Sequence, residues 1–167
     1  MSTSSLRAVE PNESVLVFSF LTLAARMAES GEATQKALVD AQLTKYWLDW
    51  GRADDIGIVA QRVGDGLPLS CAWVRAFARE DPDCLGEGIL VLACATIAEA
   101  RGTGIGTRVL GALIEQCRSH ANCNGISLSV RTDNPAVRLY ERLGFRRVHE
   151  VTNRVGSRSL EMLLRFD

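Results

Sequence analysis

The feature that most constrains this chain is a glycine-rich loop between two apolar segments. Ile89–Ile97 (ILVLACATI) is almost entirely apolar, which is typical of a strand covered on both faces. Arg101–Gly106 (RGTGIG) breaks this pattern, and from Thr107 onward apolar residues recur on one face of a predicted helix. A buried strand, a loop and an amphipathic helix together require a sheet packed against helices, so we expect an α/β fold.

Hydrophobic periodicity and turn residues predict the remaining elements. The predicted helices are Val15–Met27, Thr34–Trp50, a third that begins at Thr107, and a fourth that starts at Pro135, is capped by Asp133 or Asn134 and ends at Gly144. The other predicted strands are Leu6–Val9, Ile56–Val63, Leu69–Phe77, Ile126–Val130, Phe145–Val151 and Ser159–Arg165. A chain of 167 residues without repeats or long linkers suits a single domain over residues 1–167.

Composition argues against several classes of protein. The net charge of −1 does not suit a nucleic-acid binder that works through bulk positive charge. Val15–Ala25 is the longest apolar run, but it is too short to span a bilayer and lacks the basic start of a signal peptide. Five cysteines without a CxxC pair are typical of a reduced protein, so we expect a cytoplasmic location and no membrane or nucleic-acid partner.

Cys117, His120 and Cys123 form a CxxHxxC pattern that has two interpretations. A zinc site would need a fourth ligand, and the sequence offers no evident one. The alternative is the end of an amphipathic helix that runs into a turn, with Cys117 as a small core residue. We therefore expect no metal.

The glycine loop has the chemistry of an anion site. Backbone N–H groups at a helix start lack partners within the helix, and the helix dipole favours negative charge there. Glycine lets the backbone approach phosphate oxygens because no Cβ is in the way. A P-loop needs Lys-Ser/Thr after its last glycine, whereas Thr107-Arg108 follows here, and a dinucleotide loop needs G-x-G-x-x-G rather than G-x-G-x-G. A loop that merely starts a helix is the remaining alternative.

Two segments resemble the GCN5-related N-acetyltransferase (GNAT) family. Arg101–Gly106 matches its (Gln/Arg)-x-x-Gly-x-(Gly/Ala) signature, and Asp133–Phe145 (DNPAVRLYERLGF) is similar to a second block of that family. The strong part of the resemblance covers about Ile89–Val148. It implies a mixed, mostly antiparallel central sheet flanked by helices and splayed at its two central strands.

The resemblance also implies an activity and a set of contacts. The chain would transfer an acetyl group from acetyl-CoA to a primary amine of a small molecule or peptide, by direct attack in a ternary complex. Ala95 and Thr96 would pair with the pantetheine arm, Asn134 would contact the end of that arm, and Tyr140 would lie beside the sulfur. The pyrophosphate would be bound by the backbone amides of Arg101, Gly102, Thr103, Gly104, Ile105, Gly106 and Thr107.

Acyl transfer to an amine needs a neutral amine, donors for the oxyanion and an acid for the leaving thiolate. A backbone N–H near Thr96 would serve the oxyanion, and Tyr140 is the candidate acid. Many relatives carry a glutamate in the strand before the glycine loop, but Ile89–Ala98 contains no acid and Val91 aligns with that position. Glu87, at the start of the strand, is the candidate base. A water relay or an already neutral amine would also suffice, and a non-catalytic acyl-CoA-binding or sensing module is the alternative function.

An uneven charge distribution along the sequence indicates the class of acceptor. Residues 1–100 carry 14 acidic and 8 basic side chains, whereas residues 101–167 carry 6 acidic and 11 basic ones. Tyr46, Trp47 and Trp50 lie among the acidic residues, where they would either bind a cationic amine or anchor a helix to the core. We expect a small cationic amine or a peptide N-terminus as acceptor. A homodimer is also expected, because the outer edge of the late strands would need cover.

Overall fold

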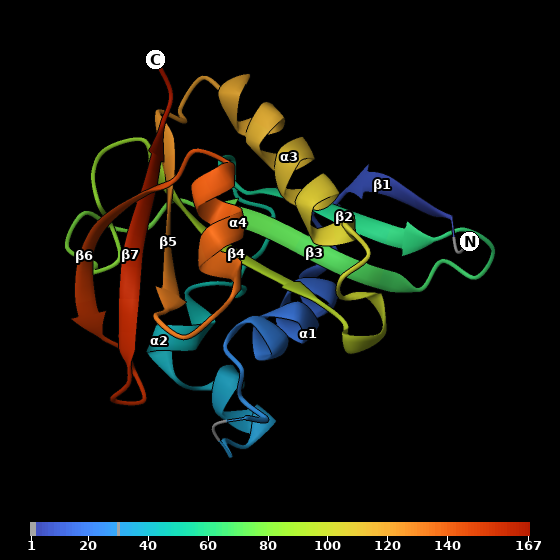
Figure 1. Cartoon of the computed structure of the whole chain (residues 1–167), viewed down its shortest axis with the longest axis horizontal. Helices are drawn as coiled ribbons and strands as arrows, with labels where there is room; N and C mark the ends of the chain where they lie inside the picture. Colours follow the sequence, from blue (N-terminus) through green and yellow to red (C-terminus); the bar gives the residue numbers. More distant parts are fainter. Residues whose placement is uncertain (1–2, 30) are drawn as a thin grey trace.

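The computed structural model describes residues 3–29 and 31–167. Within these residues, seven strands form one sheet in the order β1-β2-β3-β4-β5-β7-β6 (Figure 1). All neighbouring strands are antiparallel except β4 and β5, which are parallel. The strands are β1 (Ser4–Ala8), β2 (Ile56–Arg62), β3 (Pro68–Arg75), β4 (Ile89–Thr96), β5 (Gly125–Arg131), β6 (Arg146–Thr152) and β7 (Arg158–Arg165). The expectation of a mixed, mostly antiparallel sheet is confirmed.

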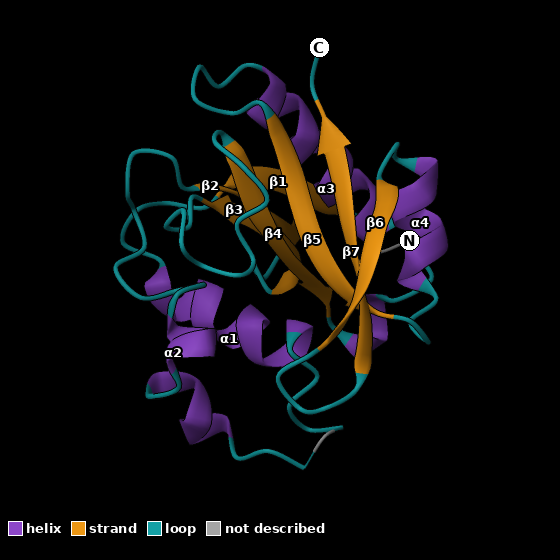
Figure 2. Cartoon of the chain, turned by 90° about the vertical axis from the view of Figure 1, so that its left-hand side faces the viewer, coloured by secondary structure: helices purple, strands orange, loops and turns teal. Residues whose placement is uncertain are grey.

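Helices cover both faces of the sheet, as Figure 2 shows. α1 and α2 lie against one face, and α3 and α4 lie against the other. Their bounds are Ser14–Ala24 for α1, Ala41–Thr44 for α2, Ile105–Arg118 for α3 and Ala136–Arg142 for α4. Two short 3₁₀ turns, η1 (Thr34–Leu38) and η2 (Ala98–Ala100), complete the described helical segments.

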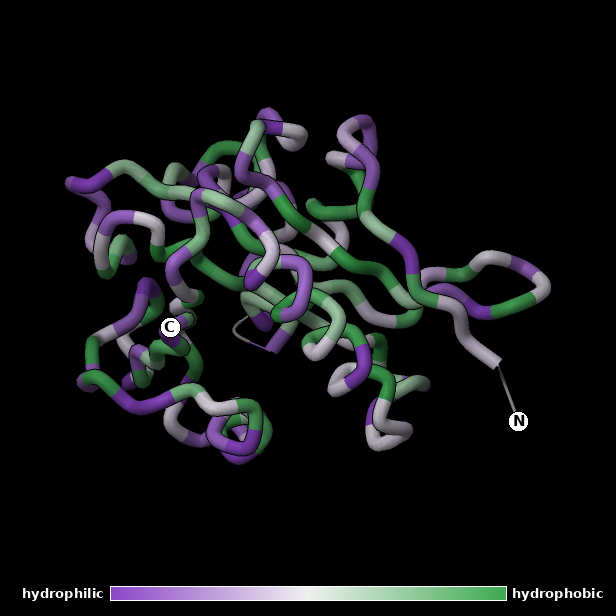
Figure 3. The backbone as a smooth tube through the Cα atoms, turned by 90° about the horizontal axis from the view of Figure 1, so that it is seen from above, coloured by the Kyte–Doolittle hydropathy of each residue, from purple (hydrophilic) through white to green (hydrophobic). Residues whose placement is uncertain are grey.

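Side-chain alternation along the strands divides the core in two. On β3, Ala72 and Val74 belong to the cluster under α3 and α4, whereas Cys71 and Trp73 belong to the cluster under α1. The predicted helix from Thr107 directs Val109, Leu110 and Leu113 into the first cluster. Figure 3 shows green, hydrophobic segments through the middle of the molecule and purple ones mainly at its periphery. The central strands are therefore covered on both faces, as the apolar run Ile89–Ile97 indicated.

The two central strands are held together over a short stretch only. β4 pairs with β5 at Ile89–Gly125, Leu90–Ile126 and Val91–Ser127. Beyond Val91, β4 continues to Thr96 alongside β3, and β5 continues to Arg131 alongside β7. The sheet consequently opens between these two strands, which is the splay that the sequence resemblance implied.

The predicted helix Thr34–Trp50 is wrong in its extent. The structure has η1, then a break, then the single turn of α2. Asp40 is extended (ψ 118°) and its side chain accepts a hydrogen bond from the backbone N–H of Gln42 at 2.9 Å. An aspartate that caps a new helix start ends the preceding helix, and this local competition outweighs the continuous apolar periodicity.

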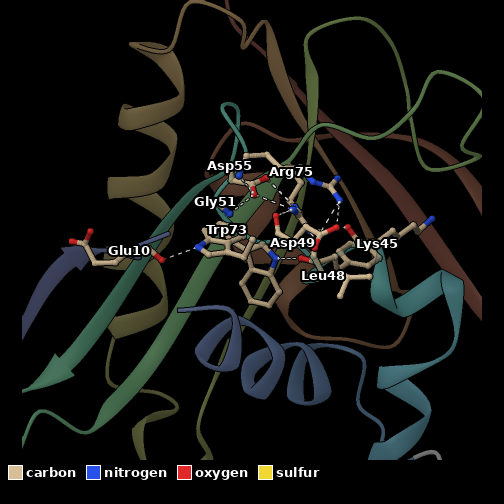
Figure 4. Close-up of polar contacts among 11 residues, drawn as sticks. Glu10, Lys45, Leu48, Asp49, Gly51, Asp55, Trp73 and Arg75 are labelled. Atoms are coloured by element: carbon tan, nitrogen blue, oxygen red, sulfur yellow. Dashed lines mark hydrogen bonds and ion pairs between the residues drawn. The ribbon is translucent and has the colours of Figure 1, made fainter. Parts of the chain in front are cut away.

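A buried arginine fixes the irregular segment that follows α2. Arg75, at the end of β3, is fully buried and forms an ion pair with Asp55, with Nε–Oδ1 and Nη2–Oδ2 distances of 2.9 and 3.0 Å (Figure 4). Its guanidinium also donates to the backbone carbonyls of Leu48 at 2.7 Å and Asp49 at 3.1 Å. These bonds satisfy carbonyls that a continuous helix would have paired internally.

Among the late strands, β6 forms one of the two edges of the sheet, and β1 forms the other. Most residues of β6 are exposed, and Arg146, Arg147, His149 and Glu150 place charge along it. Charged edge residues disfavour pairing with a further strand. Homodimerisation stays a prediction. Among the described residues, no helix combines the length and apolar character needed to cross a bilayer.

We predict that Asp55→Asn lowers the free energy of unfolding by about 3–5 kcal/mol, because the substitution leaves a buried guanidinium without its counter-charge. Urea denaturation followed by circular dichroism measures this change. Asp65→Asn is the matched control, since Asp65 pairs with Arg62 at the surface, where side-chain exposures are 55% and 39%. That control should change stability by no more than about 1 kcal/mol. Equal effects of the two substitutions would contradict the role given to Arg75.

Candidate active site

The glycine loop connects the open end of β4 to α3. η2 follows β4 directly, and Gly104 is the N-cap residue of α3. Gly102 and Gly104 have φ values of +72° and +81°, in the left-handed region that favours glycine. Thr103 Oγ1 donates to the carbonyl of Ala100 at 2.6 Å, which ties the loop to η2. The turn therefore depends on glycine at both positions.

The loop presents unpaired donors to open space. Within the part of the chain that the structure describes, no backbone carbonyl accepts from the amides of Gly102, Thr103 or Gly104. The amides of Ile105, Gly106 and Thr107 lie in the first turn of α3, where a helix supplies no acceptors. A Cβ placed on Gly102 or Gly104 would meet nothing within 4 Å. Free N–H groups, an open approach and the positive end of a 14-residue helix fit a pyrophosphate group.

Arg101 differs from the glycines that follow it. Its backbone N–H is directed to the carbonyl of Ala98 at 3.3 Å. Its exposed side chain donates from Nε to the carbonyl of Thr96 at 3.2 Å. Arg101 thus joins the loop to the end of β4, and of the predicted amides its own is already engaged.

The unpaired edge of β4 leads from the loop into the opening. Residues 89–92 of β4 are buried and residues 93–96 are half-buried, which matches the point where β5 departs. Ala95 packs toward the cluster under α1, and Thr96 Oγ1 lies 2.8 Å from Ser70 Oγ of β3. The carbonyl of Ala95 accepts a hydrogen bond from Ser70 Oγ of β3 at 3.2 Å, and the carbonyl of Thr96 accepts one from Arg101 Nε, so pairing of Ala95 and Thr96 with a pantetheine arm stays a prediction. An unpaired strand edge can bond to an extended, amide-bearing arm.

Tyr140 reaches the opening from the opposite side of β4. It lies on α4 with 8% of its surface exposed, and its hydroxyl is 3.0 Å from Sγ of Cys94. Cys94 lies in the half-buried part of β4, where the sheet has opened. Burial raises the pKa of Tyr140 well above its usual value, and Cys94 adds to this shift. The phenol therefore stays protonated at neutral pH, as a proton donor must.

Asn134 is located at the start of α4. Its Oδ1 accepts a hydrogen bond from the backbone N–H of Ala136 at 2.9 Å, so this side chain caps the helix as the sequence suggested. Pro135, predicted as the first helical residue, stands immediately before it as the N-cap. The carbonyl oxygen of Asn134 is used in capping, which leaves its amide nitrogen for any contact with a ligand.

Glu87 is not brought together with Tyr140. It lies in the turn before Ile89, and its side chain is 88% exposed and 3.6 Å from Arg79. The Tyr140 hydroxyl lies next to Cys94. Cys94 is five residues beyond Ile89, so the distance along β4 between these two residues is roughly 16 Å. The two side chains are therefore not placed together here, and Glu87 as the base stays a prediction.

A small cavity lies on the opposite face of the sheet from Tyr140. Val91 lines it, so the position that aligns with the glutamate of relatives faces this cavity. Its polar lining comes from β5, β7, the segment after α2 and the loop before β4. The lining residues are Tyr46, Asp83, Leu85, Val91, Ser127, Leu128, Ser129 and Glu161.

The sequence alone did not identify this cavity. The alternating segment ISLSV predicted a strand with one buried face, which implies solvent around its serines, yet Ser127 is only 2% exposed. Glu161 is 7% exposed within β7, between the buried Leu160 and Met162. The one signal in the sequence is an acid flanked by two apolar residues, and that pattern does not show which cavity the acid faces.

The aromatic residues of the second helical segment have separate roles. Trp47 Nε1 donates to the carbonyl of Ala37 at 2.9 Å, and Trp50 Nε1 donates to the carbonyl of Glu10 at 3.0 Å. Both tryptophans pack in the cluster under α1, so they anchor this segment to the core. Tyr46 alone of the three lines the cavity. Its hydroxyl lies 3.4 Å from Asp83 Oδ2.

The CxxHxxC residues have different partners. His120 Nε2 lies 2.8 Å from Asp54 Oδ1, whereas the buried thiols of Cys117 and Cys123 interact with each other. Within residues 3–29 and 31–167, no three His, Cys, Asp or Glu side chains are arranged to hold a metal ion.

Comparisons with known proteins agree with this geometry. The family model described as "Acetyltransferase (GNAT) family" matches residues 27–145. An N-alpha-acetyltransferase of Saccharolobus solfataricus is 31% identical over 105 residues, and the match spans 62% of each of the two chains. This chain thus covers less than two-thirds of the length of that relative.

Solved structures share the fold. The acetyltransferase of the GNAT family from Streptococcus pneumoniae superposes with a TM-score of 0.72 at 18% identity, over 99% of this chain and 100% of that one. Arabidopsis thaliana NAA60 in complex with acetyl-CoA superposes with a TM-score of 0.66 at 18% identity, over 98% of each chain. Since the family model matches well over half of the sequence, the chain belongs to the acetyltransferase (GNAT) family.

Proposed function

We propose that this protein is an acetyl-CoA-dependent N-acetyltransferase that acetylates a primary amine of a small molecule or peptide by direct attack in a ternary complex. The observation that carries the proposal is the opening between β4 and β5, with unpaired loop amides at one end and the Tyr140 hydroxyl against its wall. A single gap that accepts an acyl donor along β4 and an amine from the cavity on the other face suits direct transfer.

Each group along the opening has a separate task. The amides of residues 102–107 hold the pyrophosphate, and the backbone at Ala95 and Thr96 bonds to the pantetheine arm. A backbone N–H at the end of β4 stabilises the developing oxyanion. The Tyr140 hydroxyl donates the proton that the leaving sulfur requires. Burial of Tyr140 keeps water from its hydroxyl, which strengthens the electrostatic effect of that group.

The acceptor that suits the charges at the cavity is a cationic amine. Glu161 and Asp83 bring carboxylates to the cavity, and of these two Asp83 already pairs with Lys45 at 2.6 Å. The similar protein from S. solfataricus is named an N-alpha-acetyltransferase, so a peptide N-terminus is the first acceptor to test. The carboxylates predicted near Trp47 and Trp50 act elsewhere, since Asp55 pairs with Arg75 and Asp54 with His120.

The central test is amine-dependent release of CoA thiol. We expect turnover of acetyl-CoA with peptides that bear a free N-terminus or with small cationic amines, and slower turnover with amines that carry a carboxylate next to the amino group. A thiol-reactive dye measures the release, and N-terminally blocked peptides serve as controls. Tight CoA binding without turnover for any amine would instead favour a non-catalytic acyl-CoA-binding module.

A second prediction concerns the loop. Gly104→Ala should weaken CoA binding by about 10- to 100-fold, because a methyl group enters the phosphate approach and charge-assisted amide bonds are lost. Gly156→Ala is the matched control, since Gly156 has the same φ of +81° and an equally open surrounding, but lies in the β6–β7 turn. Both variants bear the same backbone strain, so only the first should lose affinity in calorimetric titration. Equal CoA affinities of the two variants would contradict the assignment of the pyrophosphate to this loop.

A third prediction concerns the acid. Tyr140→Phe should lower kcat by about 10²-fold or more, with CoA affinity within a factor of about three of wild type, because the phenol contributes in the transition state. Cys94→Ala removes the bond to the hydroxyl but keeps the hydroxyl itself, so its kcat should fall by less than about tenfold. Because the Tyr140 pKa is raised, the wild-type rate should not decline from loss of this proton below about pH 10. An unchanged kcat for Tyr140→Phe would exclude the assignment.

A further inference from the structure

Two buried polar groups in the cavity lack hydrogen bonds. Ser127 is 2% exposed, and its Oγ has no hydrogen-bond partner among the described residues. Glu161 is 7% exposed, and its Oε2 likewise accepts no hydrogen bond there. His149 Nε2 approaches this oxygen to 2.7 Å, but without the alignment of a hydrogen bond. Buried polar groups are normally satisfied, so two unsatisfied ones lining the same cavity indicate a polar ligand.

The register places Glu161 beside the opening. Ser127 pairs with Val91, the last residue of β4 that contacts β5, and Ser129 pairs with Glu161 in the next row of the same face. Leu160 and Met162 belong to the cluster under α3 and α4, so the side chain of Glu161 projects from the other face. Tyr140 belongs to that same α3–α4 cluster. The carboxylate and the phenol therefore approach the gap from opposite faces of the sheet.

The surroundings of Glu161 make its carboxylate a stronger base than usual. Burial raises the pKa of Glu161, His149 from β6 opposes the shift, and Asp83 from the loop before β4 adds to it. Tyr46 faces the same cavity, and burial with Asp83 raises the pKa of its hydroxyl, which therefore stays neutral. Arg131, one row further along β5, lies 3.3 Å from Asp133, which supplies its counter-charge.

We propose that Glu161 binds the ammonium group of the acceptor amine and takes its proton. This proposal rests on the proposed function and adds to it the residue that binds the acceptor's ammonium group and neutralises it. Ser127 Oγ and Ser129 are placed to accept the remaining N–H bonds of that ammonium. An ammonium group has three donors and no acceptor, which suits Glu161 Oε2 and Ser127 Oγ, both without a hydrogen-bond partner among the described residues.

The proton and electron balance is complete with these residues. One proton moves from the ammonium to the Glu161 carboxylate, and the freed lone pair forms the bond to the acetyl carbon. The C–S bond breaks, its electron pair goes to sulfur, and the Tyr140 hydroxyl protonates that sulfur. The second proton of the attacking nitrogen then restores the Tyr140 phenol. The net proton stays on Glu161, and His149, 54% exposed at 2.7 Å, leads from it to solvent.

The test compares Glu161→Gln with Glu150→Gln. Glu150 lies on the neighbouring strand and pairs with Arg158 at the surface, so it is a matched glutamate outside the cavity. With the best wild-type amine from the thiol-release panel, Glu161→Gln should lower kcat by about 10²- to 10⁴-fold, while CoA affinity stays within about threefold. Glu150→Gln should retain wild-type kcat. Retained kcat in Glu161→Gln, or a loss of CoA affinity as large as the loss of rate, would overturn the proposal.

The pH profile separates proton transfer from a structural role. A base must be ionised, so wild-type kcat/KM should rise as pH increases through the raised pKa of Glu161 and then level off. In Glu161→Gln this limb should disappear, and kcat/KM should rise with unit slope up to the pKa of the amine, because only neutral amine reacts. Identical profiles would refute proton transfer to Glu161.

A readout without acetyl-CoA completes the test. Carbon-13 NMR of the labelled protein, assigned by the signal missing in Glu161→Gln, should give a carboxyl pKa above the ordinary value of 4.5. A value at or below 4.5 would contradict the proposal. A wild-type protein that releases no thiol with any amine would instead refute the proposed function itself, so the two failures are distinguishable.

Discussion

The separation of β4 from β5 is the constraint on which the rest of the site depends. Three residue pairs join two half-sheets, each of which keeps its own antiparallel partners to the ends of the strands. Strand twist carries the two halves apart once that short pairing ends. The opening leaves one backbone edge of residues 93–96 without a strand partner. It also lets side chains from both faces of the sheet approach the gap between β4 and β5. The amides of the glycine loop, the Tyr140 phenol and the Glu161 carboxylate can act together only because all three border this gap.

An open sheet carries a cost that a bound molecule can offset. Unpaired backbone groups that leave water lose about 1–3 kcal/mol each. The structure satisfies few of them internally: Arg101 Nε caps the carbonyl of Thr96, and the Tyr140 hydroxyl contacts a side chain, Cys94, rather than the backbone. Under the proposed function, an amide-bearing arm completes the groups that remain, and its binding energy at the gap is then also folding energy. On the other face, Ser127 Oγ and Glu161 Oε2 likewise lack hydrogen-bond partners among the described residues.

The sequence predicted what depends on local pattern and missed what depends on long-range placement. The order of the strands' segments, the glycine loop, the Asn134 cap and the position of Tyr140 on a helix all followed from short motifs, and the structure has each of them. The prediction of a continuous helix over Thr34–Trp50 was wrong because Asp40 caps a new helix start inside it. Arg75, which pairs with Asp55, then fixes the conformation of the residues after α2. Glu87 was chosen by nearness in sequence to β4, whereas Glu161 reaches the opening through β5–β7 pairing, which no local pattern reveals.

Strand register connects the fold of this half-sheet to its chemistry. Ile126, Leu160 and Met162 face α3 and α4, while Ser127, Ser129 and Glu161 face the cavity. A slip of β7 by one residue would exchange these sets and bury the Glu161 carboxylate among aliphatic side chains. Burying an unpaired carboxylate in apolar surroundings costs several kcal/mol, so the slipped register is strongly disfavoured. The residues that make the cavity polar are therefore also those that exclude the alternative register, and the carboxylate is held in its row by the same hydrophobic contacts that surround Tyr140.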